Sequence, residues 1–166
     1  MGLVIRVDYI KYTMIEGYLQ CCSDILSMLT IPCCTTINFR KIGKGSDGLL
    51  ALERYFIEHC QKAINFHLIA LDDWKKLLTD RLDYWIYPIF HNKKIQDEIC
   101  NYKVKYIVEN INSLLEDFFY GKVIEAFTLS KEDEEVLKVS FNFQKNENFI
   151  FKSGREIFFL QFAITK

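Results

Sequence analysis

The longest periodic segment of this 166-residue chain, Lys93–Phe119, constrains the fold more than any other stretch. At about 100° per residue, a helix here carries two apolar stripes. The first runs along most of its length and consists of Cys100, Val104, Ile107, Ile111, Leu114 and Phe118. The second is rotated away from the first and confined to the front half, and consists of Ile95, Ile99, Tyr102 and Tyr106. One stripe is typical of an ordinary amphipathic helix. Two stripes predict that a sheet covers one side of the front half, and that another part of the chain or a partner protein covers a second side.

Helical spacing predicts three more helices. The first begins at Thr13, where Thr13 and Glu16 form a capping box. It ends before Pro32, because the residue that precedes a proline avoids helical geometry. The other two helices cover Leu49–Lys62 and Trp74–Asp83.

Alternating apolar and polar residues, many of them aromatic or β-branched, predict the strands. Pro88 restricts one of them to a sheet edge or a loop. Residues 131–135 are predicted to form an acidic surface loop and residues 146–148 a turn. The predicted strands are Leu3–Tyr9, Thr35–Ile42, Ile64–Leu71, Tyr84–Phe90, Val123–Thr128, Leu137–Phe143, Phe149–Lys152 and Glu156–Ile164. Strands and helices in this order indicate an α+β fold, with an antiparallel sheet and hairpins in the last third.

Composition limits the function classes that fit. Half of the residues are hydrophobic, and 14 Phe and nine Tyr supply large side chains for a core, so a folded domain is expected. The length fits a single domain over residues 1–166. The net charge is −1 and no long basic run is present, so nucleic acid is a poor candidate partner.

The N-terminal residues give no targeting signal. Arg6 and Asp8 interrupt what would be the apolar region of a secretory leader, and Arg6 also breaks the myristoylation pattern. The chain has no apolar run of about 18 residues, so no membrane span is predicted. We therefore expect an intracellular protein with reduced thiols.

The six cysteines do not form a metal-binding pattern. Cys21-Cys22 and Cys33-Cys34 are adjacent pairs, and adjacent side chains point in different directions, so neither pair can readily chelate one ion. His59 beside Cys60 has no further ligand near it in the sequence. Buried, reduced cysteines are the favoured interpretation, with no metal and no cofactor.

A glycine motif raises the one enzymatic alternative. Gly43–Gly48 reads GKGSDG, which matches G-x-G-x-x-G between a predicted strand and a predicted helix, with Asp72-Asp73 after the next strand. The context argues against a dinucleotide site. Arg40 and Lys41 precede the loop where a buried strand should end, and Asp47 would place a negative charge where a phosphate must bind. A solvated loop is the favoured interpretation, and a small nucleotide-binding enzyme stays as the alternative.

The three histidines, His59, His67 and His91, do not form a spaced set of metal ligands. A Cys–His catalytic pair could assemble only in space, and no local sequence signature supports one. The histidines therefore give little support for catalysis, and a Cys–His pair that assembles in space stays an open alternative.

Short segments along most of the chain resemble one family. The start of the long helix, from Ile95, resembles the central helix of HORMA domains, and the order of elements around it agrees. The other segments resemble the autophagy-related protein 101 family, the small HORMA subunit of the autophagy-initiation kinase complex. They are Val7-Asp8, Asn38–Lys41, Ile64–Phe66 with Asp72–Trp74 and Leu77-Leu78, Glu98–Cys100 with Lys103-Val104, and Leu137–Phe141.

This resemblance implies a HORMA domain whose long central helix packs on an antiparallel sheet, with flanking helices and hairpins. It implies a non-enzymatic adaptor of the cytoplasm and the preautophagosomal structure, which binds and stabilises the HORMA domain of autophagy-related protein 13. It also implies an open conformer that does not clasp a peptide. The 23 residues after Phe143 agree with this, because they are predicted to be strands of the domain itself.

The predicted partner surface is the front of the long helix. Ile99, Tyr102 and Tyr106 would be its apolar anchors, with Lys103 and Lys105 beside them, because tyrosine is favoured at interfaces. The alternative is that these side chains pack under the terminal strands of the same chain.

Animal members of the family carry an adjacent Trp-Pro-Phe in a protruding loop that recruits downstream factors, and this chain has no such triplet. Trp85, Pro88 and Phe90 occur close together, so Trp85 and Phe90 are candidate recruitment aromatics. The favoured interpretation places them in a strand that leads into the long helix, with the protruding loop deleted. A HORMA adaptor from checkpoint or DNA-repair machinery remains a second alternative.

Overall fold

A computed structural model describes residues 2–29, 33–45, 47–91 and 98–165, with side-chain surroundings described for all of these except 2–7, 29, 60, 83–91 and 98–104. The described part forms an α+β fold with a five-stranded antiparallel sheet and five helices. The elements in chain order are α1 (Gly2–Leu29), β1 (Cys34–Lys44), α2 (Gly48–Cys60), β2 (Leu68–Leu71), α3 (Trp74–His91), α4 (Glu98–Phe118), β3 (Ile124–Leu129), α5 (Lys131–Ser140), β4 (Phe143–Ser153) and β5 (Glu156–Thr165).

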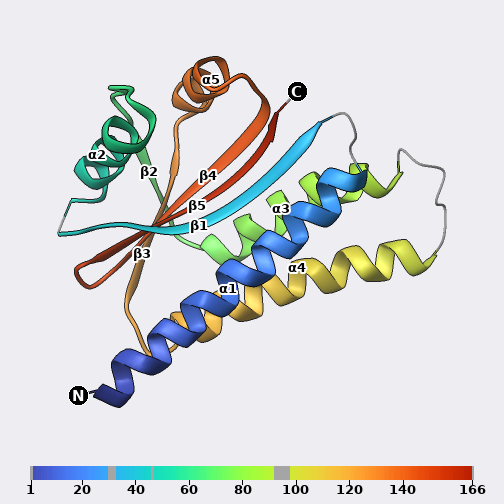
Figure 1. The fold of residues 1–166 in the computed structure, drawn as a ribbon, viewed down its shortest axis with the longest axis horizontal. Helices are drawn as coiled ribbons and strands as arrows, with labels where there is room; N and C mark the ends of the chain where they lie inside the picture. Colours follow the sequence, from blue (N-terminus) through green and yellow to red (C-terminus); the bar gives the residue numbers. More distant parts are fainter. Residues whose placement is uncertain (1, 30–32, 46, 92–97, 166) are drawn as a thin grey trace.

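The sheet lies between two layers of helices. Its strand order is β1-β5-β4-β3-β2, and all neighbouring strands are antiparallel. Figure 1 shows α1, α3 and α4 on one side of the sheet, and α2 and α5 on the other. The tight β4–β5 hairpin places the last two strands of the described chain inside the sheet, so both of their edges are paired.

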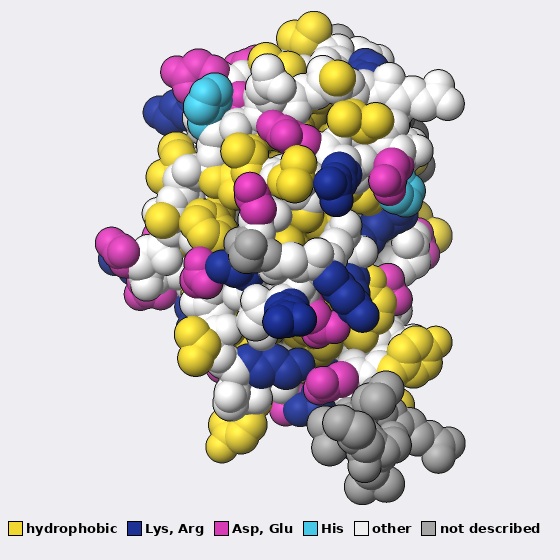
Figure 2. Space-filling view, turned by 90° about the vertical axis from the view of Figure 1, so that its left-hand side faces the viewer, with side chains coloured by type: hydrophobic (Ala, Val, Ile, Leu, Met, Phe, Trp, Pro, Cys, Tyr) yellow, Lys and Arg dark blue, Asp and Glu magenta, His cyan; other side chains and the backbone are white. Residues whose placement is uncertain are grey.

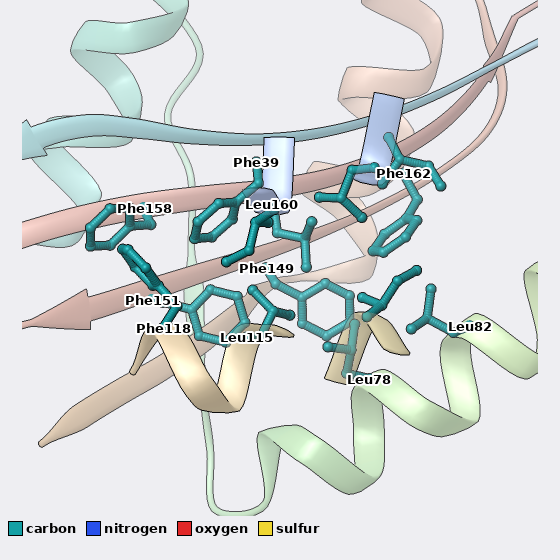
Figure 3. Packing of buried hydrophobic residues seen from close by; sticks show 14 of the residues in the cluster. Phe39, Leu78, Leu82, Leu115, Phe118, Phe149, Phe151, Phe158, Leu160 and Phe162 are labelled. Carbon is teal, nitrogen blue, oxygen red and sulfur yellow. The ribbon is translucent and has the colours of Figure 1, made fainter. Parts of the chain in front are cut away.

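Alternate residues of the central strands point into two separate cores, because successive side chains of a strand lie on opposite faces. Phe149 and Phe151 of β4 face the three-helix layer, whereas Ile150 faces α2 and α5. Figure 3 shows the larger core, in which rings from β1, β4 and β5 meet α3 and α4. Phe39 and Phe158 stack there with centroids 5.5 Å apart, and Phe118 meets both rings edge-on. Helices are therefore packed against both faces of the sheet.

The long central helix predicted from the sequence is present as α4. Its buried side chains are Val108, Ile111, Leu115 and Phe118, while Ile107 and Leu114 are partly buried at the border of the same core. The buried face is thus rotated slightly from the stripe predicted with Val104, Ile107 and Leu114. The prediction of a helix laid across the sheet is confirmed.

The N-terminal strand predicted at Leu3–Tyr9 is wrong, because a single helix, α1, covers residues 2–29. Ile15, Leu19, Cys22 and Leu26 recur at helical spacing on its buried face. Thr13 is not an N-cap, since it lies inside the helix and its hydroxyl donates to the Tyr9 carbonyl, 2.9 Å away. The alternation in the first nine residues is therefore coincidental.

Helix α1 also covers the free edge of the sheet, where β1 has no neighbouring strand. Ser27 Oγ accepts from Thr35 N and donates to Thr35 O, both at 2.9 Å. Ser23 Oγ accepts from Ile37 N at 2.7 Å, and Tyr12 Oη accepts from Lys41 N at 3.3 Å. Hydroxyl groups of α1 thus form hydrogen bonds with backbone groups of alternate residues along β1. Without α1, these backbone groups would be free to pair with a strand of another chain.

The strand predicted at Leu137–Phe143 is also wrong. Ser130 caps a helix instead, accepting from Asp133 N at 3.1 Å, and the acidic residues predicted to form a loop make up its first turn. Negative charge in the first turn stabilises a helix. The turn predicted at residues 146–148 lies inside β4. By contrast, the hairpin at Ser153-Gly154 is confirmed, with Gly154 at φ 60°.

The strand predicted at Trp85–Phe90 is part of helix α3, which continues to His91. Pro88 lies in the last turn, where the missing N–H removes one backbone hydrogen bond without ending the helix. The strand predicted at Ile64–Leu71 is reduced to four residues. Among the described helices, none combines the length and apolar character needed to span a bilayer.

Candidate interaction surface

The predicted partner residues lie on the first half of α4. Lys105 and Tyr106 are exposed, and 56% of the Tyr106 surface is accessible. The side chains of Ile99, Tyr102 and Lys103 lie outside the described residues, so their part of the prediction stays untested. Lys105 is only loosely paired, with its Nζ 3.7 Å from a Glu109 carboxylate oxygen.

Tyr106 lies next to α1. Asn110, one turn further along α4, donates to Tyr18 Oη of α1 at 3.2 Å. Burial raises the pKa of Tyr18, and the nearby Cys22 and Tyr106 add smaller contributions in the same direction. The exposed end of the predicted surface therefore meets the outer side of α1.

The outer side of α1 is apolar along most of the helix, although sequence reasoning did not find it. The outer stripe, as we name it, consists of Ile10, Met14, Gly17, Cys21, Ile25 and Met28, all exposed. At 3.6 residues per turn, these positions lie on the side of α1 that faces away from the buried Ile15, Leu19, Cys22 and Leu26. A surface helix usually carries polar residues there. Helix α1 is thus apolar on two faces, which marks the outer one as an interaction surface.

Two hollows lie near the N-terminal end of α1, and Tyr9 lines both of them. The first is a groove of about 270 Å³ lined by Tyr9, Ile10, Thr13 and Met14. The second is a cavity of about 370 Å³ at the N-terminal end of α1, a volume in the range of ligand pockets. The residues that line this cavity are Asp8, Tyr9, Tyr12, Lys41, Phe118, Glu156 and Phe158.

The charged groups around the cavity are paired with one another. Lys41 bonds Glu156, and Lys122 lies 3.4 Å from Asp8 with its ammonium 4.6 Å from the centre of the Phe118 ring. Burial raises the pKa of Tyr12 to about 12, and its hydroxyl is already hydrogen-bonded to β1. An apolar or aromatic group of a partner suits this cavity better than an ion does. Basic and acidic side chains are also interspersed on the face shown in Figure 2.

The candidate recruitment aromatics, Trp85 and Phe90, lie on α3 rather than on a strand or in a loop. Their side chains lie outside the described residues. The hypothesis that they form an exposed finger therefore stays a prediction.

Three residues of the glycine motif, Gly43, Gly45 and Asp47, make contacts within the fold. A Cβ on Gly43 would lie 3.0 Å from the Ala51 Cβ, so glycine lets β1 pass close to α2. Gly45 N donates to Arg155 O at 2.7 Å. Asp47 caps α2, accepting from Leu49 N and Leu50 N, which are the amides that a phosphate would need. The surrounding sheet is antiparallel, unlike the parallel sheet of a dinucleotide-binding fold.

One serine, one aspartate and one histidine lie together without forming a catalytic triad. Ser130 Oγ donates to Asp133 Oδ2 at 2.9 Å, and His67 Nδ1 lies 3.4 Å from the same oxygen. In a triad the imidazole sits between the other two groups, whereas here the carboxylate does. The Ser130 oxygen also serves as the helix cap. This cluster joins α5 to the chain before β2.

A buried carboxylate fastens α5 to β4. Glu134 accepts from Asn148 N at 3.1 Å and from Asn148 Nδ2 at 2.6 Å, and Asn146 Nδ2 also donates to it. Burial raises the pKa of Glu134 to about 8, although these donors oppose the shift. All of its partners belong to the fold, so we assign Glu134 a structural role.

The cysteines differ in burial. Cys22 is buried, as predicted, and burial raises the pKa of its thiol to about 11. The prediction is wrong for Cys21 and Cys34, which are exposed. In the part of the chain with described side chains, no three His, Cys, Asp or Glu residues gather into a group that could hold a metal ion.

Comparison with known proteins identifies no relative: no protein-family model, curated protein or solved structure matches this chain.

Proposed function

We propose that this chain is a non-enzymatic adaptor of the HORMA class, which binds and stabilises the HORMA domain of autophagy-related protein 13 in the autophagy-initiation kinase complex. It would act in the cytoplasm and at the preautophagosomal structure. The short segments that resemble the autophagy-related protein 101 family motivate the choice of partner.

The arrangement of the elements is compatible with this class. Three helices, including the long α4, cover one face of an antiparallel sheet, and the last two strands are internal strands of that sheet. Two features depart from the implied pattern: α1 occupies the N-terminal residues where a strand was expected, and Leu137–Phe141, matched to a late strand of the family, lies at the end of helix α5. Even so, α1 leads into β1, and the order of helix, strand, helix and strand up to α4 agrees with the resemblance.

One observation carries the proposal of an adaptor: exposed apolar side chains lie on two neighbouring helices, α1 and α4. Tyr106 belongs to the predicted partner surface on α4, and the outer stripe lies on α1, which contacts α4 through the Asn110–Tyr18 hydrogen bond. Large aromatic and aliphatic side chains that protrude beside a pocket are typical of the centre of a protein interface.

Co-expression with the HORMA domain of autophagy-related protein 13 tests this pairing. We expect the tagged wild-type chain to recover the partner, and Tyr106→Glu to recover at least about tenfold less, since one tenfold step needs only about 1.4 kcal/mol. Because Tyr106 is exposed, the variant should melt at the same temperature as the wild type.

The matched control is Val139→Glu, which places the same charge at an exposed position on α5, on the other side of the sheet. It should recover the partner as well as the wild type does. Failure of the wild type to recover the partner, or equal recovery by Tyr106→Glu, would contradict the proposal.

A further inference from the structure

Gly17 has no role within the chain that requires glycine. It lies in the middle of α1 on the exposed side, and a Cβ added there would meet nothing within 4 Å. Its φ is not positive. Glycine inside a helix destabilises it by roughly 0.5–1 kcal/mol relative to alanine. Its position on the outer stripe suggests that something outside the chain approaches closely at this point.

The outer stripe is graded in size from its centre to its ends. Gly17 and Cys21 occupy the middle, Ile10 and Met14 lie toward the N-terminal end, and Ile25 and Met28 lie toward the C-terminal end. Most steps between these positions alternate between four and three residues, which is the spacing of a helix–helix seam. Small residues at the middle would let a second helix cross there at short distance.

The same stripe is complementary to itself when a second copy runs antiparallel and the two-fold axis passes beside Leu19. Ile10 then faces Met28 of the second copy, Met14 faces its Ile25, and Gly17 faces its Cys21. Met28 is the most exposed residue of the stripe, at 70%. It comes to lie at the groove formed by Tyr9, Ile10, Thr13 and Met14. A protruding side chain and a groove that fits it, at opposite ends of one helix, are what a two-fold interface requires.

Charge does not oppose this pairing. The outer stripe itself carries no ionisable side chain except the Cys21 thiol. Asp24, on its rim, would lie opposite Thr13 of the second copy. Lys11, on the other rim, is held by the Asp117 carboxylate at 3.0 Å. No like charges are brought together, so the pairing meets no repulsion of the kind that excludes wrong partners.

We propose that the outer stripe seats a second copy of this chain, forming a two-fold dimer through antiparallel α1 helices. From Ile10 to Met28 the seam is about 27 Å long at 1.5 Å per residue. Specific dimers bury about 800 Å² on each partner, and a single pair of helices of this length forms a smaller interface than most of them. The dimer is therefore weak and reversible. This inference concerns the chain alone, and the dimer would compete with the proposed pairing where both use the outer stripe.

Sedimentation velocity of the purified full chain, from low micromolar to submillimolar concentration, tests the proposal. The wild type should shift from monomer to dimer across this range. Met14→Glu should stay monomeric with an unchanged melting temperature, because Met14 is 57% exposed. Val139→Glu, with the same charge on α5, should dimerise like the wild type. A wild type that stays monomeric, or a Met14→Glu variant that dimerises, would overturn the proposal.

The Gly17→Ala variant distinguishes an effect on the stability of the fold from an effect on dimerisation. The alanine should raise the melting temperature, because it removes a mid-helix glycine, and should weaken the dimer several-fold, because its methyl group separates the helices. A rise in melting temperature with unchanged dimerisation would contradict the proposal that the two α1 helices pack closely at Gly17.

Cross-linking with a short bismaleimide gives a second readout, since Cys21 is exposed near the two-fold axis. The dimer should be trapped in the wild type and lost in Cys21→Ser. A cross-link that survives in Cys21→Ser would contradict the position of Cys21 beside the two-fold axis. A chain that is monomeric alone yet binds the partner HORMA domain would overturn this inference and leave the proposed function intact.

Discussion

At the scale of single residues, a network of buried polar side chains connects α5 to the sheet. Asn148 is fully buried inside β4, and its backbone and side-chain amides both donate to Glu134. Gln161 of β5 completes the network by donating to Asn148 Oδ1 at 3.0 Å. A buried network of this kind is stabilising only while all its members are satisfied, so the ionisation state of Glu134 matters for stability.

We predict that Glu134 makes the stability of the chain depend on pH. Its pKa is about 8 in the folded chain, against an ordinary value of 4.5, so folding favours the protonated acid. Its contribution is therefore greatest below pH 4.5 and decreases as the pH rises toward 8, by a few kcal/mol at about 1.4 kcal/mol per pKa unit.

Urea unfolding of the wild type and of Glu134→Gln from pH 5 to pH 8 measures this effect. Groups such as His59 and His67 are common to both proteins and cancel in the comparison. The difference in unfolding free energy between the two should change across this range in favour of the variant. Parallel pH profiles would show that Glu134 does not titrate there.

At the scale of elements, α1 replaces the missing neighbour of strand β1. Ser23→Ala should lower the free energy of unfolding by about 1–3 kcal/mol, because the buried Ile37 N–H loses its acceptor. Ser23→Ala combined with Ser27→Ala should also promote aggregation, since the edge strand then carries unpaired amides.

Urea titration and light scattering measure these two effects. Thr13→Ala is the matched control, because the Thr13 hydroxyl is exposed and bonds only within its own helix. Its unfolding free energy should change by less than about 0.5 kcal/mol. If Ser23→Ala and Thr13→Ala were equally stable, α1 would not be the partner of the strand edge.

Sequence periodicity predicted α2, α4, β3 and β5, where the pattern within each segment agrees with its packing. The prediction from periodicity was wrong where the residues of a segment fit both a helix and a strand. In residues 137–143 the alternation is misleading, since Leu137 is buried and Val139 is 81% exposed on the same helix. The decisive signal lay just upstream, in the Ser130 cap and the acidic first turn, which had been interpreted as a loop. Asn148 was assigned to a turn because its buried partner, Glu134, is distant in sequence.

At the scale of the whole molecule, the α+β class and the helix laid across the sheet could be predicted, but the candidate surface only in part. Tyr106 was predicted from the second stripe of α4, with Lys105 beside it, and both are exposed. The outer stripe of α1 was missed although the helix predicted from Thr13 contains all of its residues except Ile10, because only the buried face of that helix was considered. Reading residues 10–28 as one helix would have revealed apolar residues on two faces.

The central proposal is that this chain binds the HORMA domain of autophagy-related protein 13 through its exposed apolar surface. Calorimetric titration of the chain with the HORMA domain of autophagy-related protein 13, at several temperatures, tests it most directly. The account predicts saturable one-to-one binding with a negative heat-capacity change, because apolar surface is buried. Absence of heat at every temperature, together with separate sedimentation of the two proteins at submillimolar concentration, would contradict it.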